Sequence, residues 1–143
     1  MIPLLAAVLG MTLHEWAHAR CALACGDATA FHLGRVSLNP LRHADPVWSV
    51  AVPLLTWYAL GIPVGAGRPV PVNVRGRDRV LVHLAGPAAN LWLAGVCALG
   101  AMAWPPLWRA VWVNLVLAGL NLLGPDGWHV VRGIKEARRV PAR

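Results

Sequence analysis

The sequence predicts an all-α membrane protein with three transmembrane helices, a re-entrant segment and a short extended or hairpin region. Apolar residues make up 57% of its 143 residues and charged residues only 13%, whereas a soluble domain is about half apolar and about a quarter charged. The mean hydropathy is +0.54. The apolar residues gather in four stretches, 2–24, 46–63, 80–104 and 107–124. We expect residues 1–143 to form a single membrane-embedded domain.

Only some of these stretches fit a straight transmembrane helix, which needs about 20 apolar residues. Residues 80–104 are long enough, and residues 107–124 are just long enough. Residues 46–63 contain Pro53 and end in Gly-Ile-Pro, so they form a poor straight span. We therefore expect this second stretch to enter the bilayer without crossing it, which is possible where protein or a water-filled cavity covers the backbone.

The first stretch is long enough to span only if it includes four polar residues, His14, Glu15, His18 and Arg20. Residues 2–13 also resemble a signal-peptide core, followed by an A-x-A pattern at residues 17–19. The start lacks a basic region, however, and Glu and His lie directly before the supposed cleavage site. We therefore favour a helix that stays in the membrane.

The polar residues of the first stretch form the pattern H-E-x-x-H at residues 14–18. On a helix, positions i and i+4 lie on one face, so His14 and His18 can reach one metal ion. Glu15 lies about 100° round the helix from His14, where it can act as a general base without being a ligand. A charge at the centre of a membrane helix costs about 2.5–3.5 kcal/mol on insertion scales. The apolar surroundings therefore favour a functional motif over an ordinary polar face.

A catalytic zinc site needs a third protein ligand and leaves its fourth position to water. Among the six acidic residues, Asp126 stands out because it closes the last apolar stretch. Asp27 is too near the H-E-x-x-H motif, Asp45 precedes a proline as in a turn, and Asp78 lies among arginines. Pro-Asp-Gly at residues 125–127 is also strong turn chemistry. From the residues alone, Asp126 is either a ligand or a turn residue.

The sidedness of the membrane helps to choose between topologies. If all four stretches crossed the bilayer, His18 and Asp126 would lie at opposite faces. If the second stretch is re-entrant, they lie at the same face and one metal ion can join them. In that topology Arg109 alone, of the thirteen Lys and Arg residues, lies on the far side. The positive-inside rule favours this larger bias and places the metal nearer the cytosolic face.

The polar links carry the remaining signals. Residues 61–78 hold three prolines in an alternating pattern, which is typical of an extended segment or short hairpin, and the tail from Arg132 predicts a short basic helix or a frayed end. The net charge of +7 does not indicate nucleic acid, because the basic residues lie where lipid head groups would meet them. The odd count of three cysteines excludes a disulfide framework. Cys21 lies one turn after His18, but a small buried residue is favoured over a ligand.

Further motifs cover almost the whole chain, namely GRVSLNPLRHADP at 34–46, RPVPVN at 68–73, AGPAAN at 85–90 and NLLGPDG at 121–127. Together with HEWAH at 14–18, they resemble the site-2 protease family, especially its small bacterial members. The last motif is shorter than the proline-rich family pattern before its Asp-Gly. Trp128 stands where a second Gly is common in the family.

The resemblance implies a set of site residues: His14, His18 and Asp126 as Zn²⁺ ligands, Glu15 as catalytic base, and Asn90 and Asn121 as substrate-binding residues. Each Asn could bind the substrate strand or the oxyanion, or it could form an interhelical hydrogen bond. His129, three residues after Asp126, could substitute as a ligand, although a surface role is favoured.

The implied function is an intramembrane zinc metalloendopeptidase that hydrolyses peptide bonds of membrane-anchored substrates. It would be a multi-pass protein of the bacterial cytoplasmic membrane, with the lipid bilayer and a membrane-protein or peptide substrate as partners. Strand addition along residues 61–78 could hold an extended substrate. The alternative is a catalytically inactive homologue that binds a metal or a partner. A metal transporter would need further ligands along a path, and the sequence offers none.

Overall fold

The computed structural model describes residues 1–61 and 68–139, and every regular element in these ranges is a helix. This confirms the all-α prediction. The four long helices are α1 (Ile2–Ala24), α4 (Gly76–Ala101), α5 (Trp108–Leu123) and α6 (Pro125–Arg139). The shorter elements are α2 (Thr29–His32), the 3-10 turns η1 (Pro40–Arg42) and η3 (Pro105–Leu107), the π-helical turn η2 (Pro46–Ala51) and α3 (Val52–Leu60).

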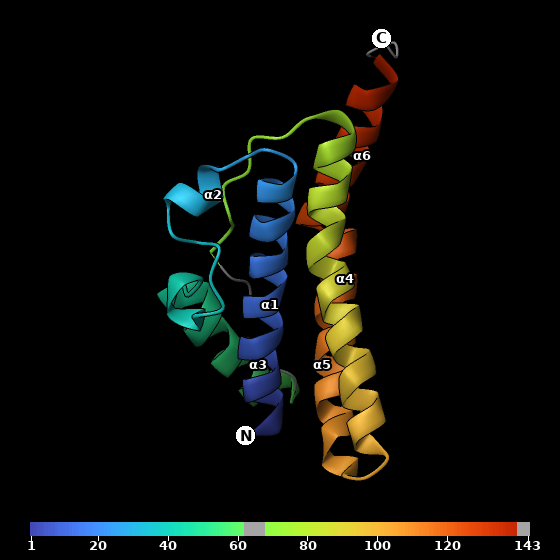
Figure 1. Ribbon diagram of the computed structural model, residues 1–143. Coiled ribbons are helices and arrows are strands. Elements are labelled where there is room, and N and C mark those ends of the chain that lie inside the picture. The colour runs from blue at the N-terminus through green and yellow to red at the C-terminus, as the bar shows by residue number, and fades with distance from the viewer. Residues whose placement is uncertain (62–67, 140–143) are drawn as a thin grey trace.

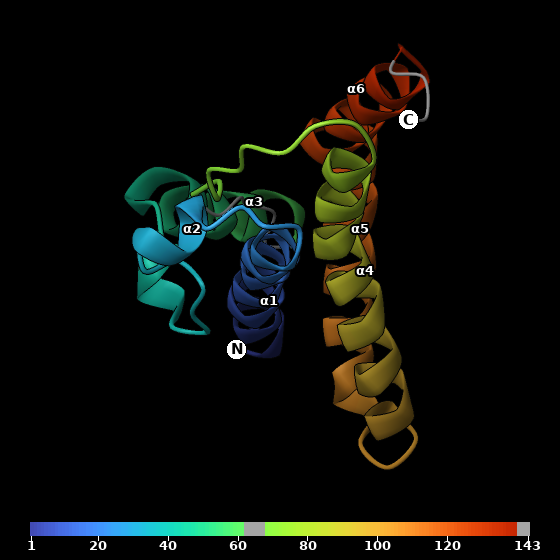
Figure 2. The same cartoon turned by 45° about the horizontal axis from the view of Figure 1, so that its top comes forward.

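The long helices α1, α4 and α5 lie side by side (Figure 1). The end of α1, the start of α4 and the end of α5 lie together at one end of this bundle, and α6 extends beyond α5 at that end. Helix α2 lies on the opposite side of α1 from α4 and α5, whereas α3 runs behind α1 in the view of Figure 2. This arrangement brings the end of α1 and the start of α6 to the same end of the bundle.

Two helical segments among the described residues are long and apolar enough to cross a membrane, Gly76–Ala101 and Pro105–Leu123. Only 33% of the most apolar window of each is buried within the protein, whereas the core helix of a soluble domain would be mostly covered. Large apolar side chains are exposed along these helices, including Trp92, Leu99, Trp108 and Trp112. Helix α1 has a similar length but carries the polar motif at residues 14–18.

The second apolar stretch forms two short pieces, η2 and α3, rather than one long helix. Asp45 accepts hydrogen bonds from the backbone N–H groups of Val47 and Trp48, each at 3.0 Å, and so begins η2 as a capping residue. The predicted turn role of Asp45 is therefore confirmed. Helix α3 ends at Gly61, whose φ of 71° is left-handed, a conformation that glycine adopts without steric cost.

The predicted hairpin lies partly outside the described residues, since residues 62–67 are not among them. Residues 68–75 form no strand or helix and lead to the start of α4 (Figure 1). Their apolar side chains pack on α1, where Val70 joins Ala19 and Val74 joins Ala22 in small buried clusters. This part of the hairpin prediction is not confirmed, because the segment packs against a helix instead of pairing with a strand.

Close packing of α1 on α5 fixes the position of the H-E-x-x-H motif. Ala6 and Ala7 pack on Ala110, Val113 and Leu117. A Cβ added to Gly10 would lie 2.4 Å from Oδ1 of Asn114. Small residues at such a contact let two membrane helices approach closely, so this packing sets where α1 presents its next turn.

The shortened motif before Asp126 forms a tight turn between α5 and α6. A Cβ added to Gly127 would lie 1.7 Å from the carbonyl oxygen of Leu122, and one added to Gly124 would lie 2.8 Å from that of Leu120. Pro125 begins α6, a position where its missing N–H costs nothing. The helical tail predicted from Arg132 is the second half of α6, because the turn already restarts the helix at Pro125.

Candidate metal centre

Three buried side chains from α1 and α6 converge on one point. Nε2 of His14 and Nε2 of His18 are 3.0 Å apart. The carboxylate of Asp126 lies 3.1 Å from Nε2 of His14 through Oδ2, and 3.3 Å from Nε2 of His18 through Oδ1. One ligand atom from each residue lies within 4.8 Å of the other two. The three residues predicted as metal ligands therefore lie together, although they come from opposite ends of the chain.

The hydrogen bonds of the two imidazoles fit a cation at this point. Nδ1 of His18 lies 2.7 Å from the carbonyl oxygen of Val82, which can only accept, so Nδ1 carries the proton and Nε2 keeps a lone pair. Nδ1 of His14 lies 3.1 Å from the side-chain amide of Asn90. Nδ2 of this amide faces the ring, and its Oδ1 has no partner in the described structure. Turning the amide by about 180° pairs Oδ1 with an N–H at Nδ1 of His14, which gives His14 the same tautomer as His18.

Two nitrogen lone pairs and a carboxylate then face one another. Such a set repels itself unless a cation lies between its members, and two His with one carboxylate is a known donor set for catalytic zinc. Partners on the second nitrogen of a metal-binding His fix its tautomer and its orientation. Val82 and Asn90 supply those partners here.

His83 is a site residue that the sequence prediction missed. Its Nδ1 lies 3.0 Å from Oδ1 of Asp126, and its ring stacks on His129 with centroids 4.2 Å apart and planes 8° apart. His83 is therefore placed to orient the carboxylate of Asp126. The signal was present in the sequence, since His83, Gly86 and Asn90 follow one another at helical spacing on one face of an apolar stretch.

Electrostatics hold Asp126 in its charged form. Burial would raise the pKa of this carboxyl group, but the hydrogen bond that Nδ1 of His83 donates to Oδ1 favours the charged form. A carboxylate that stays charged while it is buried is a strong ligand for a cation.

Gly86 allows α4 to approach the two histidines. A Cβ at this position would lie 2.4 Å from Nε2 of His18 and 2.7 Å from Cε1 of His14. The AGPAAN motif therefore contributes a close contact between the backbone of α4 and the imidazoles, as well as the amide of Asn90. Pro87, which follows, cannot donate a backbone hydrogen bond to the carbonyl of His83 one turn earlier.

Glu15 lies beside the group on α1 and is 8% exposed. Its Oε2 accepts a 3.0 Å hydrogen bond from the backbone N–H of Val70. Segment 68–75 thus holds the predicted base from the side opposite α4. Glu15 is not a member of the three-residue group, as expected for a base that is not a ligand.

The other residues considered in the sequence analysis differ in whether they contact this centre. Asn90 contacts His14, whereas Asn121 donates a 2.9 Å hydrogen bond to the carbonyl of Leu117 within its own helix. Asp27 accepts hydrogen bonds from Thr29 and from the backbone of Asn73, and it is not part of the metal group. Cys21 has a free thiol and packs against the cluster of Ala22, Val74 and Val82, as expected for a small packing residue that is not a metal ligand.

Comparison with known proteins gives three informative relatives. The chain is 38% identical over 151 residues to the "Putative zinc metalloprotease YwhC" of Bacillus subtilis, an alignment that covers 89% of this chain and 66% of the relative. It is 35% identical to the "Putative zinc metalloprotease Rip2" of Mycolicibacterium smegmatis and 33% identical to that of Mycobacterium tuberculosis, covering 85% of this chain and 52% of each relative. No family model matches the chain, and no solved structure matches it significantly.

The chain spans about two thirds of the first relative and about half of the others. The alignments nevertheless include most of this chain, and the names of the relatives agree with a group that could hold a metal ion. The predicted cofactor, zinc, is confirmed by the names of the relatives together with this group. The chain therefore belongs to the site-2 protease family of zinc metalloproteases.

Proposed function

We propose that this protein is an intramembrane zinc metalloendopeptidase that hydrolyses peptide bonds of membrane-anchored substrates. The observation that carries the proposal is the convergence of His14, His18 and Asp126 beside Glu15, within helices whose outer surfaces are largely apolar. In this proposal the three converging residues hold the zinc ion and Glu15 is the catalytic base.

The proposed topology has three transmembrane helices, α1, α4 and α5, with η2 and α3 as the re-entrant segment. It is supported by the common location of the end of α1, the start of α4 and the end of α5 (Figure 1). Arg109 lies at the start of α5, at the opposite end of the bundle from the basic helix α6. The positive-inside rule then orients α6 towards the cytosol, as a multi-pass protein of the bacterial cytoplasmic membrane.

The chemistry divides between the metal and the chain. A bound zinc ion would act as a Lewis acid that polarises the scissile carbonyl and makes water more acidic. Glu15 takes a proton from the attacking water and returns it to the leaving amine. The hydrogen bond from the N–H of Val70 holds one oxygen of Glu15 and leaves the other free for that proton.

The two asparagines take different roles in this proposal. Asn90 acts through His14, because its amide contacts the ring nitrogen that faces away from the metal position. Asn121 is half-buried in the last turn of α5, close in the chain to Asp126. Its contact with the substrate stays a prediction.

Replacing Glu15 with Gln tests the proposal. The isosteric amide should leave zinc bound and lower the rate of cleavage at least about 100-fold, since a positioned general base contributes about 10²–10⁴. The assay is cleavage of a library of membrane-spanning fluorogenic peptides by the zinc-loaded protein in lipid vesicles. Glu136→Gln is the matched control, because Glu136 lies on α6 among arginines.

Two results would contradict the proposal. Equal cleavage by the wild type and Glu15→Gln would remove Glu15 from the chemistry. A wild type that holds zinc but cleaves no member of the library would support the inactive homologue instead.

A further inference from the structure

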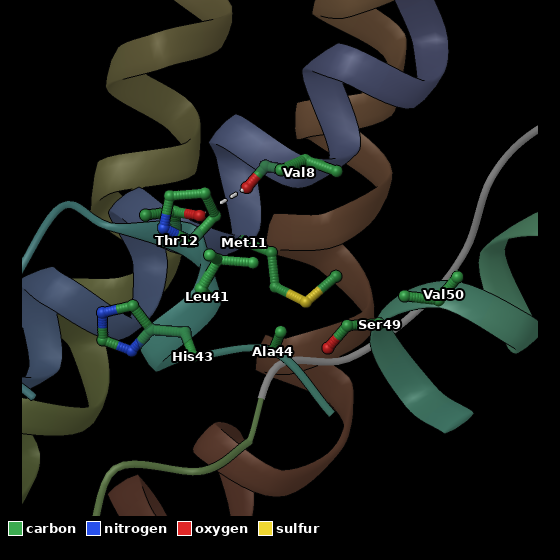
Figure 3. A pocket seen from close by; sticks show the side chains of 9 residues that line it. Val8, Met11, Thr12, Leu41, His43, Ala44, Ser49 and Val50 are labelled. Atoms are coloured by element: carbon green, nitrogen blue, oxygen red, sulfur yellow. Dashed lines mark hydrogen bonds between the residues drawn. The ribbon is translucent and has the colours of Figure 1, made fainter. Parts of the chain in front are cut away.

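A cavity of about 220 Å³ lies between α1 and the segment that contains η1 and η2. Figure 3 shows side chains from both sides of it. Its walls are mostly apolar and include Val8, Met11 and Thr12 of α1 together with Leu41, Ala44 and Val50. None of these residues belongs to the metal group.

The cavity is next to the proposed catalytic base. Met11 and Thr12 precede Glu15 by four and three residues, so all three lie on one face of α1, about one helical turn of 5.4 Å apart. His14 is three residues after Met11 and lies about 60° round the helix from it, in the other direction from Glu15. A substrate bond placed at the metal would therefore have this cavity about one helical turn away along α1.

Residues 68–70 connect Glu15 and the cavity by a second path. The N–H of Val70 donates to Glu15, and the N–H of Arg68 donates to the carbonyl oxygen of His43 at 2.8 Å. His43 lines the cavity. Two residues of extended chain span at most about 7 Å, so one short segment joins the backbone of the cavity wall to the carboxylate of Glu15.

His43 is held in this wall by two contacts. The residue is 2% exposed, and its Nε2 lies 2.7 Å from the carbonyl oxygen of Ser37. Its own carbonyl oxygen accepts the hydrogen bond from the N–H of Arg68. These contacts fix His43, so the cavity has a defined wall on this side.

We propose that this cavity is a specificity subsite, which receives the apolar side chain of the substrate residue next to the scissile bond. The proposal rests on the proposed proteolytic function. An aliphatic cavity of about 150 Å³ holds a benzene molecule, so about 220 Å³ accommodates a Leu, Met or Phe side chain. A mostly apolar lining is also the usual composition of a ligand pocket.

The test compares membrane-spanning peptides that differ only in the residue flanking the scissile bond. The wild type should cleave the Leu peptide about tenfold faster in kcat/KM than the Ala peptide, as a pocket that discriminates by a few methylenes allows. Ala44→Leu fills the cavity and should bring this ratio close to one. Ala59→Leu is the matched control, because Ala59 is exposed on α3 and does not line the cavity; its ratio should equal that of the wild type.

A second variant and a binding assay keep the result clear. Val50→Ala enlarges the cavity and should raise the ratio of Phe to Leu cleavage. Peptide hydroxamates with a Leu or an Ala side chain should show the same preference when they bind zinc-loaded Glu15→Gln, measured by calorimetry without any turnover. This binding preference survives even if the wild type proves to be inactive, which separates the failure of the subsite from the failure of the proposed function.

Unchanged cleavage and binding ratios in Ala44→Leu and Val50→Ala, with zinc still bound, would overturn the subsite. The cavity would then belong to a lipid chain or to packing between α1 and the re-entrant segment.

Discussion

Two carboxylates on α6, Asp126 and Glu136, both contact α4, but they do so in opposite ways. Glu136 accepts hydrogen bonds from the backbone N–H of Gly76 at 3.0 Å and from the guanidinium groups of Arg79 and Arg132, each at 3.1 Å. Its negative charge is balanced by side chains of the protein itself. Asp126 instead meets three imidazoles, which are those of His14, His18 and His83.

The difference shows which cluster needs something from outside. Arginine is always charged, so the group around Glu136 is complete and acts as a structural clamp that holds the start of α4 on α6. A neutral imidazole has one nitrogen without a proton. When the outer nitrogens of His14 and His18 carry the protons, the inner nitrogens of these two rings present lone pairs to each other. That group is complete only with a cation.

Removing each carboxylate in turn should give the largest contrast. Asp126→Ala removes one of three ligands and should abolish the binding of about one zinc ion per chain, whereas Glu136→Ala should leave zinc content unchanged. The measurement is zinc content by mass spectrometry of detergent-solubilised, dialysed protein. If Asp126→Ala kept its zinc, Asp126 would be a turn residue only, and the three-span topology would lose its main support.

Adding one methyl group tests the space over the histidines. Gly86→Ala should weaken zinc binding strongly, because its Cβ would lie 2.4 Å from Nε2 of His18. Gly95→Ala in the same helix meets nothing within 4 Å and should retain zinc, with a stability gain of up to about 1 kcal/mol from helix propensity. Competition with a zinc chelator measures both affinities. Equal affinities would mean that α1 and α4 do not approach as described.

Residues that hydrogen-bond to the two carboxylates should show the same contrast in their effect on zinc affinity. His83→Ala should weaken zinc binding about 10–100-fold, the usual effect of losing a partner that orients a ligand. Arg132→Ala removes a hydrogen bond to Glu136 and should not change zinc affinity. His83→Gln, which can still donate to Asp126, should recover part of the loss. A zinc affinity that is the same in His83→Ala and the wild type would reduce His83 to a packing residue.

The clamp at Glu136 should stabilise the folded protein by a small amount that depends on pH. The hydrogen bond from Gly76, with further contributions from Arg79 and Arg132, lowers the pKa of Glu136 below its ordinary value of 4.5. A depressed pKa in the folded state gives stability that is present above the ordinary pKa and is lost as pH falls through the folded pKa. In metal-free protein, the wild type should therefore unfold at a higher temperature than Glu136→Gln at pH 6, and this difference should shrink as pH falls below 4.5. A constant difference would mean that the charge of Glu136 does not contribute.

The sequence by itself determined the local chemistry. The spacing of His14 and His18 requires only a helix, because the 3.6-residue turn places positions i and i+4 on one face. Glu15 follows from the same geometry. The helical class and the apolar stretches also follow from composition and length, and the capping role of Asp45 follows from its place before Pro46. All of these depend on neighbours within a few residues.

Only the tertiary structure decided which distant groups meet. Asp126 reaches the histidines because the tight turn at Gly124 and Gly127 ends α5 and starts α6 beside them, and local patterns do not record such contacts. The roles of His83, Gly86 and Val70 depend on how closely α4 and segment 68–75 approach α1. Distances between helices come from the packing of whole surfaces rather than from the spacing of residues along one helix, so these partners could not be read from the sequence.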